Sequence, residues 1–584
     1  MDAPRHCVAL LSAFYRRSAL WLACVVVGCA VFSIASAAPL KVPATYPTIQ
    51  AAINAWKQGD VIWVAQGTYT ENLRLKPGVR LEGGYKADYS ARNWNAWPSV
   101  VDGAQQGSVV IGADEATLDG FTLRNGKAAM GGGVLLERAS MTIKNNTIED
   151  NVADNGGGGI YIGFNPPAPP YTDIESNVIR RNQVVTDRGG MGGGILISNS
   201  SAGVRITRNV IGGSMGNGNS AVAGGGGISV EFTSLFQIEE NTISHNTGGR
   251  FHGGGVIITD GTPNATLSRN TITFNSVQGN FGGGVYSIGG TFISRNNVAF
   301  NSIFNTIAYG GGIAVDSPGG TPPRLENNFI HNNDATFGAG VYIVRGQDVI
   351  LTNNSIASNR PDAPQAGAGV YVKTGATCIL LNNVIWGNGD DFHEQSPGAC
   401  RLDHNDIEDG DQAGQNGNIS ANPAFVAYDN LHIQKSSPAI NAGNPAAAPA
   451  LDFDGDKRGK AIDIGADEVV SEQEQPCPLA RSARASYLER HLGAVRSFRD
   501  THLMTNVPGQ AAVSWYYQHA PAASAFLEQH DWARHLTRWI ATPAVLAIAF
   551  PDLALLALLA LAAPAIYRRR RAKRVAFESK GDRP

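Results

Sequence analysis

Cysteine and charged residues are scarce in this chain. Six of its 584 residues are cysteine, and Asp, Glu, Lys and Arg together make up 16% of the sequence. So few cysteines exclude a small secreted scaffold held together by many disulfides. The hydrophobic fraction of 43% excludes an intrinsically disordered chain, which combines low hydrophobicity with high net charge. The 69 glycines have no three-residue period, and this excludes collagen.

The formal net charge of -3 is unevenly distributed. Basic residues are in excess in both terminal segments, so the long body between them is acidic. Nucleic-acid-binding proteins present clusters of Lys and Arg that neutralise phosphates. The acidic body therefore predicts that nucleic acid is not a partner.

The first 37 residues have the layout of a secretory signal peptide. Arg16 and Arg17 precede an apolar run over residues 20–34, and the small residues 35–37 form a cleavage site. This pattern predicts export of the body. The alternatives are a lipoprotein signal ending at Cys29 and an uncleaved anchoring helix.

Residues 541–567 form an apolar segment with one charge, Asp552, and they are long enough to span a bilayer. The basic residues that follow, within the tail 568–584, favour a cytoplasmic position for that tail. We therefore expect a single membrane pass. A buried hairpin bent at Pro551 is the alternative.

A glycine run followed by an apolar strand recurs at intervals of 26 to 35 residues. A second motif, Asn-x-[Ile/Val]-x-x-Asn, interleaves with it, as in residues 146–151 and 270–275. Glycine inside a helix costs about 1 kcal/mol relative to alanine, so these repeats predict coils of β-strand stacked as a solenoid. The glycine runs precede Val134, Ile160, Ile195, Ile228, Val256, Val285, Ile313, Val341 and Val370.

Side-chain directions follow from strand alternation. The first apolar residue of each glycine strand should point inward and stack on its copy one coil away, and the next residue should point outward. The asparagines lie at turns, where they tolerate left-handed backbone conformations and bond their amides to the next coil. We interpret them as scaffold.

The repeats resemble those of right-handed parallel β-helix proteins of the pectin-lyase-like superfamily, from about Thr48 to Glu468. Residues 46–53 are similar to the short capping helix of that superfamily, and residues 59–69 to its first coil. The resemblance implies an all-β, right-handed parallel β-helix with an N-terminal capping helix.

Two narrower resemblances concern the C-terminal part of the chain. Residues 422–425, 437–443 and 463–468 resemble the closing region called the choice-of-anchor Q domain, found on bacterial envelope proteins. Residues 471–540 resemble the small helical CFI-box module, although Cys477-Pro478-Leu479 stands where that family has Cys-Phe-Ile.

The expected organisation has five parts. They are a signal peptide at 1–37, the β-helix at 38–470, the helical module at 471–540, a transmembrane helix at 541–567 and a basic cytoplasmic tail at 568–584.

The superfamily includes polysaccharide lyases and hydrolases. Lyases need a base beside a cation or Arg, and hydrolases need two placed carboxylates. The polygalacturonase pattern has Asn-Thr-Asp, Gly-Asp-Asp, Gly-His-Gly and Arg-Ile-Lys in consecutive coils, and this chain has only Gly389-Asp390-Asp391 with His393 nearby. Asp390, Asp391 and His393 are therefore candidate catalytic residues, and solvated turn residues are the alternative.

An acidic group has the spacing of a calcium loop: Asp452, Asp454, Asp456 and Asp463. Lys457 stands where such loops need glycine, so the match is partial. The spacing suggests a structural calcium ion as the one cofactor, and a solvated turn is the alternative.

Cys378 and Cys400 lie 22 residues apart, about one coil. A disulfide between adjacent coils is expected in an oxidising compartment, if the Cα distance allows it.

The outward position of the glycine strands holds tyrosine in four copies: Tyr161, Tyr286, Tyr342 and Tyr371. In register these rings would lie along one face, and sugar rings stack on such a surface. Tyrosine also suits exposed strands in the absence of any ligand.

These observations predict an exported, membrane-anchored envelope protein whose β-helix binds glycans and has no recognisable catalytic site. The alternatives are a polysaccharide lyase, hydrolase or epimerase acting on an acidic polysaccharide, and a structural stalk or adhesin that binds proteins. The expected partners are a polysaccharide and, through the C-terminal helix, a membrane. We expect a monomer with its body in the periplasm or on the cell surface.

Overall fold

The computed structural model describes residues 38–469, apart from 165–170, 187–188, 201–202, 234, 262–264, 320, 362–366 and 368, as well as residues 530–549 and isolated positions between 495 and 527. The chain divides into two compact units, residues 1–469 and 470–584. The expected signal peptide at 1–37, Cys477 and the basic tail at 568–584 lie outside the described residues.

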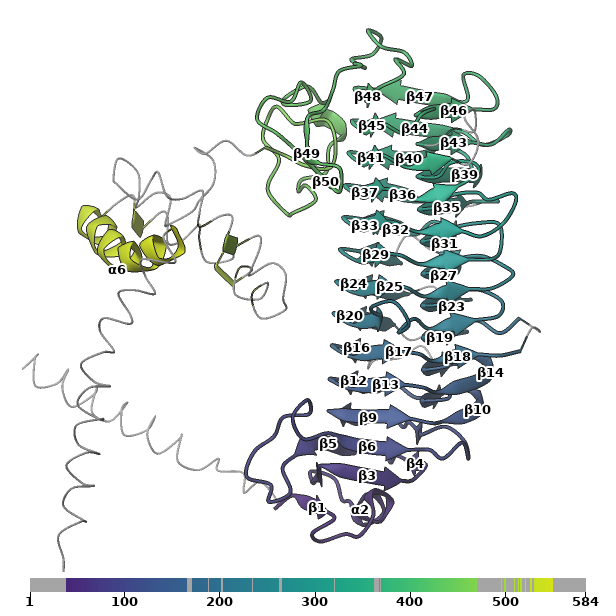
Figure 1. Ribbon diagram of the computed structural model, residues 1–584, viewed down its shortest axis with the longest axis vertical. Helices are drawn as coiled ribbons and strands as arrows, with labels where there is room; N and C mark the ends of the chain where they lie inside the picture. Colours follow the sequence, from purple (N-terminus) through teal and green to yellow (C-terminus); the bar gives the residue numbers. More distant parts are fainter. Residues whose placement is uncertain are drawn as a thin grey trace, which may run out of the picture. The chain divides into compact units, whose positions relative to one another are not determined.

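The first unit is a parallel β-solenoid (Figure 1). One coil runs through β11 (Val134–Glu137), β12 (Thr142–Lys144), β13 (Thr147–Glu149) and β14 (Val152–Gly156), and the next coil begins with β15 (Ile160–Gly163). Each strand pairs in parallel with its copies in the neighbouring coils, as β11 does with β15. The all-β solenoid predicted from the repeats is confirmed.

Four sheets run along the solenoid. We call them sheet A, which contains β12, sheet B, which contains β13, sheet C, which contains β11, and sheet D, which contains β14. Sheet A has 14 strands from β1 (Leu40–Val42) to β47 (Cys400–Asp403), sheet B has 13 from β3 (Gly67–Thr70) to β48 (Asp406–Ile407), and sheet D has nine from β10 (Lys127–Met130) to β42 (Arg360–Pro361). The 12 strands of sheet C are β4 (Leu73–Arg74), β7 (Val110–Ile111), β11, β15, β19 (Ile195–Ser198), β23 (Ile228–Glu231), β27 (Val256–Gly261), β31 (Val285–Gly289), β35 (Ile313–Asp316), β39 (Val341–Arg345), β43 (Val370–Val372) and β46 (Phe392–Glu394).

Stacked aliphatic side chains fill the interior of the solenoid. Val134, Ile160, Ile195 and Ile228, which open successive strands of sheet C, are fully buried within one continuous core. Their predicted inward direction is confirmed. Burial of one such side chain contributes about 2 kcal/mol, so stability accumulates from coil to coil.

Two ladders of asparagine side chains stabilise the turns on either side of sheet B. Asn275 Nδ2, for example, donates to Asn301 Oδ1 in the next coil at 3.0 Å and to the Ile243 carbonyl at 2.8 Å. The first ladder comprises Asn146, Asn177, Asn209, Asn241, Asn270, Asn296, Asn328, Asn354, Asn383, Asn405 and Asn418, and the second comprises Asn151, Asn182, Asn219, Asn246, Asn275, Asn301, Asn333, Asn359 and Asn388.

The predicted amide bonds between coils are therefore present, but the left-handed backbone lies elsewhere. The residue before a ladder asparagine has the positive φ in every case but Gly218, which precedes Asn219; His245 and Phe274, for example, have φ values of 59° and 55°. The ladder asparagines must keep an ordinary backbone because their own N–H groups also donate to the next amide oxygen, as in Asn275 to Asn301 at 3.0 Å. Such a turn thus uses two residues: the first bends the chain through its positive φ, and the asparagine after it forms hydrogen bonds to the next coil.

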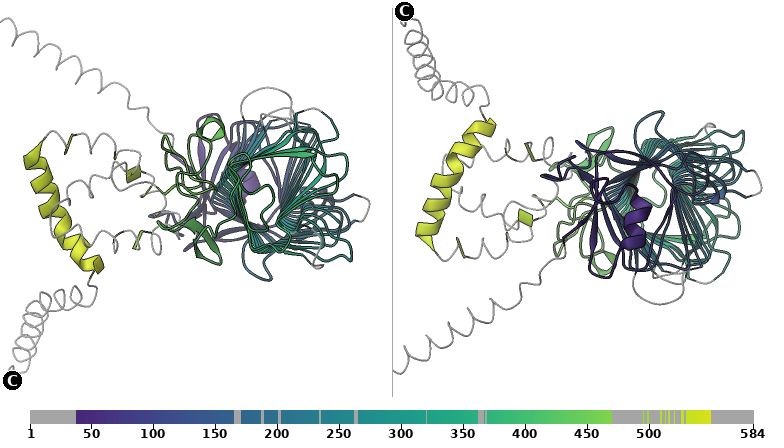
Figure 2. Two further views of the ribbon diagram at one scale, coloured as in Figure 1. Left: turned by 90° about the horizontal axis from the view of Figure 1, so that it is seen from above. Right: turned by 90° about the horizontal axis from the view of Figure 1, so that it is seen from below.

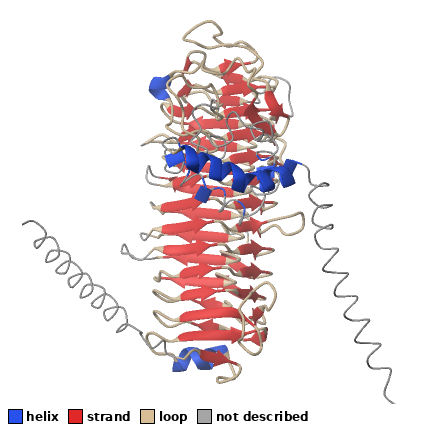
Figure 3. Ribbon diagram, turned by 90° about the vertical axis from the view of Figure 1, so that its left-hand side faces the viewer, coloured by secondary structure: helices blue, strands red, loops and turns tan. Residues whose placement is uncertain are grey.

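A helix lies at the N-terminal end of the solenoid, where residues 46–53 predict one (Figure 2, right; Figure 3). This helix is α2 (Ile49–Ala55), and the Thr48 side chain accepts a hydrogen bond from the Ala51 N–H at its start. Ile49 and Ile53 are fully buried in the same core as the strands.

Residues 422–469, which we call the closing region, pack against the outer face of sheet B beside β37 (Phe329–His331), β41 (Ser355–Ala357) and β45 (Val384–Trp386) (Figure 1). They contain the antiparallel hairpin of β49 (Phe425–Ala427) and β50 (Asn430–Ile433) and the 3₁₀ turn η1 (Pro445–Ala447). The buried Arg458 guanidinium pairs with Glu468 at 2.9 Å and donates to Asn327 Oδ1 at 2.9 Å. Asn327 precedes a ladder asparagine, so the closing region binds to the turns of the solenoid.

The second unit contains α6 (Asp531–Ala549), which crosses the boundary expected at residue 540 between the helical module and the transmembrane segment. Among the residues that the structure describes, no helix is long and apolar enough to cross a membrane. Residues 550–567 of the expected transmembrane helix lie outside the described residues.

Candidate functional site

The predicted tyrosines point outward from sheet C, but they are not exposed. Tyr161, Tyr286, Tyr342 and Tyr371 expose only 3–5% of their surface, so the expectation of an open tyrosine face is wrong. Five side chains in register on adjacent strands form what we call the inner row: Ile257, Tyr286, Ala314, Tyr342 and Tyr371.

A second row of rings covers the inner row. It consists of the residues directly before four glycine runs, His252, Phe281, Tyr309 and Phe337, and we call it the outer row. Its members are half-buried, and the ring centroids lie 5.0 Å apart between Phe281 and Tyr309 and 5.4 Å apart between Tyr309 and Phe337. The outer row thus presents a continuous aromatic surface to solvent.

The glycine run places one row over the other. Gly282 has a φ of +68°, and a Cβ there would lie 2.4 Å from the Val285 carbonyl oxygen. This left-handed turn folds Phe281 back over Tyr286, with ring centroids 5.7 Å apart. The outer row was therefore visible in the sequence as the ring-bearing residue before four of the glycine runs, and reasoning from strand alternation missed it.

The inner row continues into His393, whose ring stacks on Tyr371 at a centroid distance of 4.9 Å. His393 Nδ1 lies 3.1 Å from Asp390 Oδ2, and the Gly367 N–H donates to the same oxygen at 3.2 Å. The structure therefore brings Asp390 and His393 together, partly exposed, at one end of the aromatic rows.

Asp391 is separated from this pair. It is 1% exposed, and its Oδ1 accepts hydrogen bonds from the Asn388 backbone N–H at 3.0 Å and from Asn388 Nδ2 at 2.7 Å. Burial raises the pKa of Asp391 to about 7. The hydrogen bonds from Asn388 work to lower this pKa, and the charges of Asp409 and Glu408 raise it further. Asp391 replaces the next asparagine of the second ladder, so it is neither a solvated turn acid nor a partner of Asp390.

A buried polar group borders the inner row. Asp316 is 2% exposed and accepts two bonds from Arg345, at 2.8 Å to Nε and 2.7 Å to Nη2. Tyr286 OH donates to Asp316 at 3.4 Å. Burial raises the pKa of the Tyr286 and Tyr342 hydroxyls and lowers the pKa of His252, so these three side chains are uncharged at neutral pH.

The four acids of the expected calcium loop do not form one ligand set. Asp452 and Asp463 use both carboxylate oxygens to accept backbone N–H groups, at distances of 2.7–3.1 Å. In the described part of the chain, one group of three potential metal ligands lies within 4.8 Å of one another: His432, Asp454 and Asp467. Asp456 does not belong to it, so of the four predicted residues only Asp454 does.

His432 balances the charge of this group. Its Nε2 lies 2.9 Å from Asp454 Oδ2. Burial works to lower the pKa of His432, but the hydrogen bond and charge of Asp454 and the charges of Asp467 and Asp452 outweigh it and raise the pKa to about 9. The imidazolium is therefore protonated at neutral pH between two carboxylates.

The expected disulfide is present. Cys378 opens β44 (Cys378–Leu381), lies opposite Cys400 on the neighbouring strand β47, and is bonded to it across a Cα distance of 4.5 Å. The bond joins two adjacent coils at the C-terminal end of sheet A.

The family model described as "Right handed beta helix region" matches residues 78–235 and 226–407, which together exceed half of the chain. No curated protein matches the sequence significantly. A solved structure titled "Crystal structure of pectate lyase Pel9A" is similar over 72% of this chain and 90% of its own, with 15% identity and a TM-score of 0.31. The chain belongs to the right-handed β-helix family.

Proposed function

We propose that this protein binds glycan chains along the outer row without breaking them. The observation that carries the proposal is the continuous stack of Phe281, Tyr309 and Phe337, partly exposed and supported from below by the inner row. A sugar ring has an apolar face of C–H groups, and an aromatic surface held rigid before binding offers that face a partner at low entropic cost.

The contacts of the candidate catalytic residues favour binding over hydrolysis. Glycoside hydrolysis needs two carboxyl groups that flank the scissile bond about 5–10 Å apart. Asp391 is buried in the asparagine ladder, so of the two carboxylates predicted from the sequence only Asp390 is accessible beside His393. These two groups lie at the end of the rows, where they can accept and donate hydrogen bonds to the hydroxyls of a bound chain.

Affinity electrophoresis of the full-length chain tests this proposal. Gels would contain polygalacturonate, alginate, xyloglucan or β-glucan, and reducing ends and unsaturated-sugar absorbance would be followed in parallel. We expect retardation by at least one polymer and no product. The triple variant Phe281→Ala/Tyr309→Ala/Phe337→Ala should lose most of the retardation, by about tenfold in affinity or more.

The matched control is Phe274→Ala/Phe300→Ala, which removes another stacked aromatic pair with centroids 5.0 Å apart, in which Phe274 is 50% exposed. It should be retarded like the wild type. Equal losses of retardation in both variants, or no retardation of the wild type by any polymer, would contradict the binding proposal. Product formation would instead identify an enzyme.

We further propose that the protein is an exported envelope protein, anchored by its C-terminal segment. The signal-like residues 1–37, the apolar segment 541–567 and the choice-of-anchor resemblance of the closing region support this proposal. So does the Cys378–Cys400 disulfide, because such bonds persist in oxidising compartments. Thiol alkylation after expression in a bacterium tests it: the full-length chain should resist modification at these cysteines, whereas a chain starting at residue 38 should not.

A further inference from the structure

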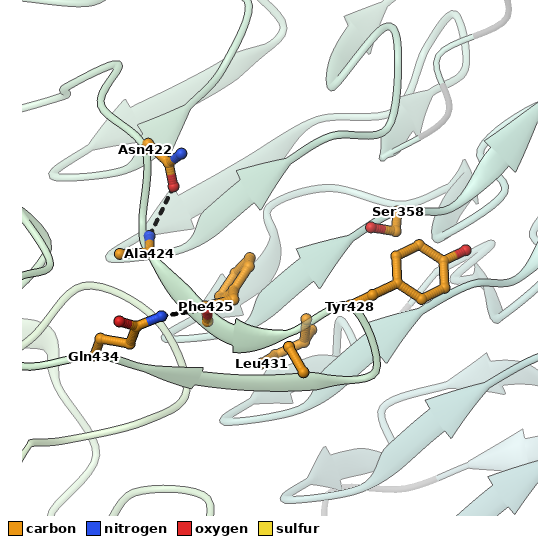
Figure 4. Close-up of a pocket in the computed structure, with 8 residues that line it drawn as sticks. Ser358, Asn422, Ala424, Phe425, Tyr428, Leu431 and Gln434 are labelled. Carbon is orange, nitrogen blue, oxygen red and sulfur yellow. Dashed lines mark hydrogen bonds between the residues drawn. The ribbon is translucent and has the colours of Figure 1, made fainter.

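A pocket of about 540 Å³ lies between the β49–β50 hairpin and the turn after β41 (Figure 4). This volume is in the range of small-molecule sites. We call it the hairpin pocket. It is lined by Ser358, Asn422, Ala424, Phe425, Ala427, Tyr428, Leu431 and Gln434.

We propose that the hairpin pocket binds one end of a short, uncharged oligosaccharide. None of the eight lining residues carries a charge, and the guanidinium of Arg360, which contacts the pocket at the Tyr428 hydroxyl, is not among them. This site is separate from the outer row: Ser358 lies at the turn before β42, whereas the outer row lies at the turn that follows sheet D.

One side of the pocket is apolar and rigid. Leu431 is 1% exposed and belongs to the cluster that joins the closing region to Phe329 of the solenoid. Tyr428 is 53% exposed, and its hydroxyl accepts a hydrogen bond from Arg360 Nη2 at 3.0 Å. The ring is therefore held in place while its face stays accessible, which suits stacking of a sugar.

The other side supplies polar atoms whose positions are set by bonds to the backbone. Asn422 Oδ1 accepts from the Ala424 N–H at 2.8 Å, and Gln434 Nε2 donates to the Phe425 carbonyl at 3.0 Å. These bonds leave Asn422 Nδ2 as a donor and Gln434 Oε1 as an acceptor for a ligand. Figure 4 shows both amides on the hairpin side of the pocket and the Ser358 hydroxyl on the solenoid side.

The Ser358 hydroxyl is accessible to a ligand because the next coil has a glycine, Gly387, at the equivalent turn. Ser358 and Gly387 both precede a ladder asparagine and both have positive φ. A Cβ on Gly387 would have Ser358 Oγ as its one neighbour within 4 Å, at 3.9 Å. The missing side chain therefore leaves space above the hydroxyl, where other coils carry rings such as Phe274 and Phe300.

Saturation-transfer NMR of the full-length chain tests the proposal with cellotriose, maltotriose, xylotriose and trigalacturonate as probes. We expect at least one neutral trisaccharide to bind, and we expect trigalacturonate not to bind to the triple variant of the outer row. Tyr428→Ala should weaken binding about tenfold or more, and Ser358→Ala by about two- to tenfold, the contribution of one hydrogen bond. Tyr428→Phe, which keeps the ring, should lie between Tyr428→Ala and the wild type.

The triple variant of the outer row separates the two glycan proposals, because it should bind the trisaccharide like the wild type. Unchanged melting temperatures would show that Tyr428→Ala and Ser358→Ala fold. The proposal is overturned if no neutral trisaccharide binds, if trigalacturonate still binds to the outer-row variant, if the pocket variants bind normally, or if only the outer-row variant loses binding.

Discussion

Asn388 Nδ2 donates a hydrogen bond to Asp391 Oδ1 at 2.7 Å, and this bond ends the second asparagine ladder. Every earlier member of the ladder accepts from one coil and donates to the next. The last position needs an acceptor only, so a carboxylate can replace the amide. An acidic residue that looks catalytic in the sequence is thereby explained as part of the scaffold.

Asp391→Asn should change stability in a pH-dependent way. The pKa of about 7 in the folded state exceeds the ordinary value of 3.8 because the carboxyl is buried. The folded state thus prefers the protonated form, and stability falls as pH rises from about 4 through 7. We expect equal urea unfolding of wild type and variant at pH 4, and a variant more stable by about 2–4 kcal/mol at pH 8.

Asp391→Ala is the control, because it removes the acceptor of two Asn388 hydrogen bonds and leaves the buried amide only the Ile356 carbonyl. This variant should be less stable than wild type at pH 4 by about 1–3 kcal/mol. A stability difference between Asp391→Asn and wild type that does not vary with pH would contradict the assignment.

Gly282→Ala should strongly destabilise the solenoid. A left-handed alanine costs about 1–2 kcal/mol, and overlap of the new Cβ with the Val285 carbonyl oxygen, at 2.4 Å, adds about 1–3 kcal/mol. Gly375→Ala is the matched control, since Gly375 has a φ of +86° but open space around its Cβ position. Denaturant unfolding should show the larger loss for Gly282→Ala, and equal losses would mean that close packing of the coils does not require the glycine.

His432→Gln should destabilise the closing region most strongly at acidic and neutral pH. The pKa of His432 is raised from 6.5 to about 9, so its contribution to stability is complete below pH 6.5 and is lost as pH rises through 9. Melting temperatures of wild type and variant should therefore converge near pH 10. Asp454→Asn should reduce the same pH dependence.

Adding Zn²⁺ tests whether His432, Asp454 and Asp467 bind a metal ion instead. Imidazole and carboxylates also bind Zn²⁺, and ligand binding to the folded state raises stability. With a protonated His432 in the group, we expect no change in the melting temperature at pH 7. A rise that disappears in His432→Gln would show that His432, Asp454 and Asp467 bind a metal instead.

Removal of the disulfide by Cys378→Ser/Cys400→Ser should cost about 3 kcal/mol, the value expected for a loop of 22 residues. Urea unfolding of the wild type in the presence of a strong reductant should approach that of the variant. If the reductant has no effect on the wild type, the bond does not contribute to stability.

Local patterns in the sequence predicted the scaffold well. Glycine runs and asparagines at regular intervals predicted stacked coils, and alternation correctly placed Val134 and Ile160 in the interior. The same reasoning placed Tyr342 outside the core but could not show that Tyr309, from the neighbouring coil, covers it at a centroid distance of 4.8 Å. Exposure depends on neighbours from other coils, which a single strand does not specify.

The sequence by itself determined the architecture, because every coil repeats the same local rules of glycine turns, inward aliphatic residues and asparagine amides. The tertiary structure decided the candidate sites. Only the folded structure shows that Asp391 completes a ladder, that Asp390 meets His393, and that the closing region forms a pocket against Ser358. The physical reason is that periodicity is a local property of the chain, whereas a site depends on contacts between residues that are distant in sequence or brought together by one turn.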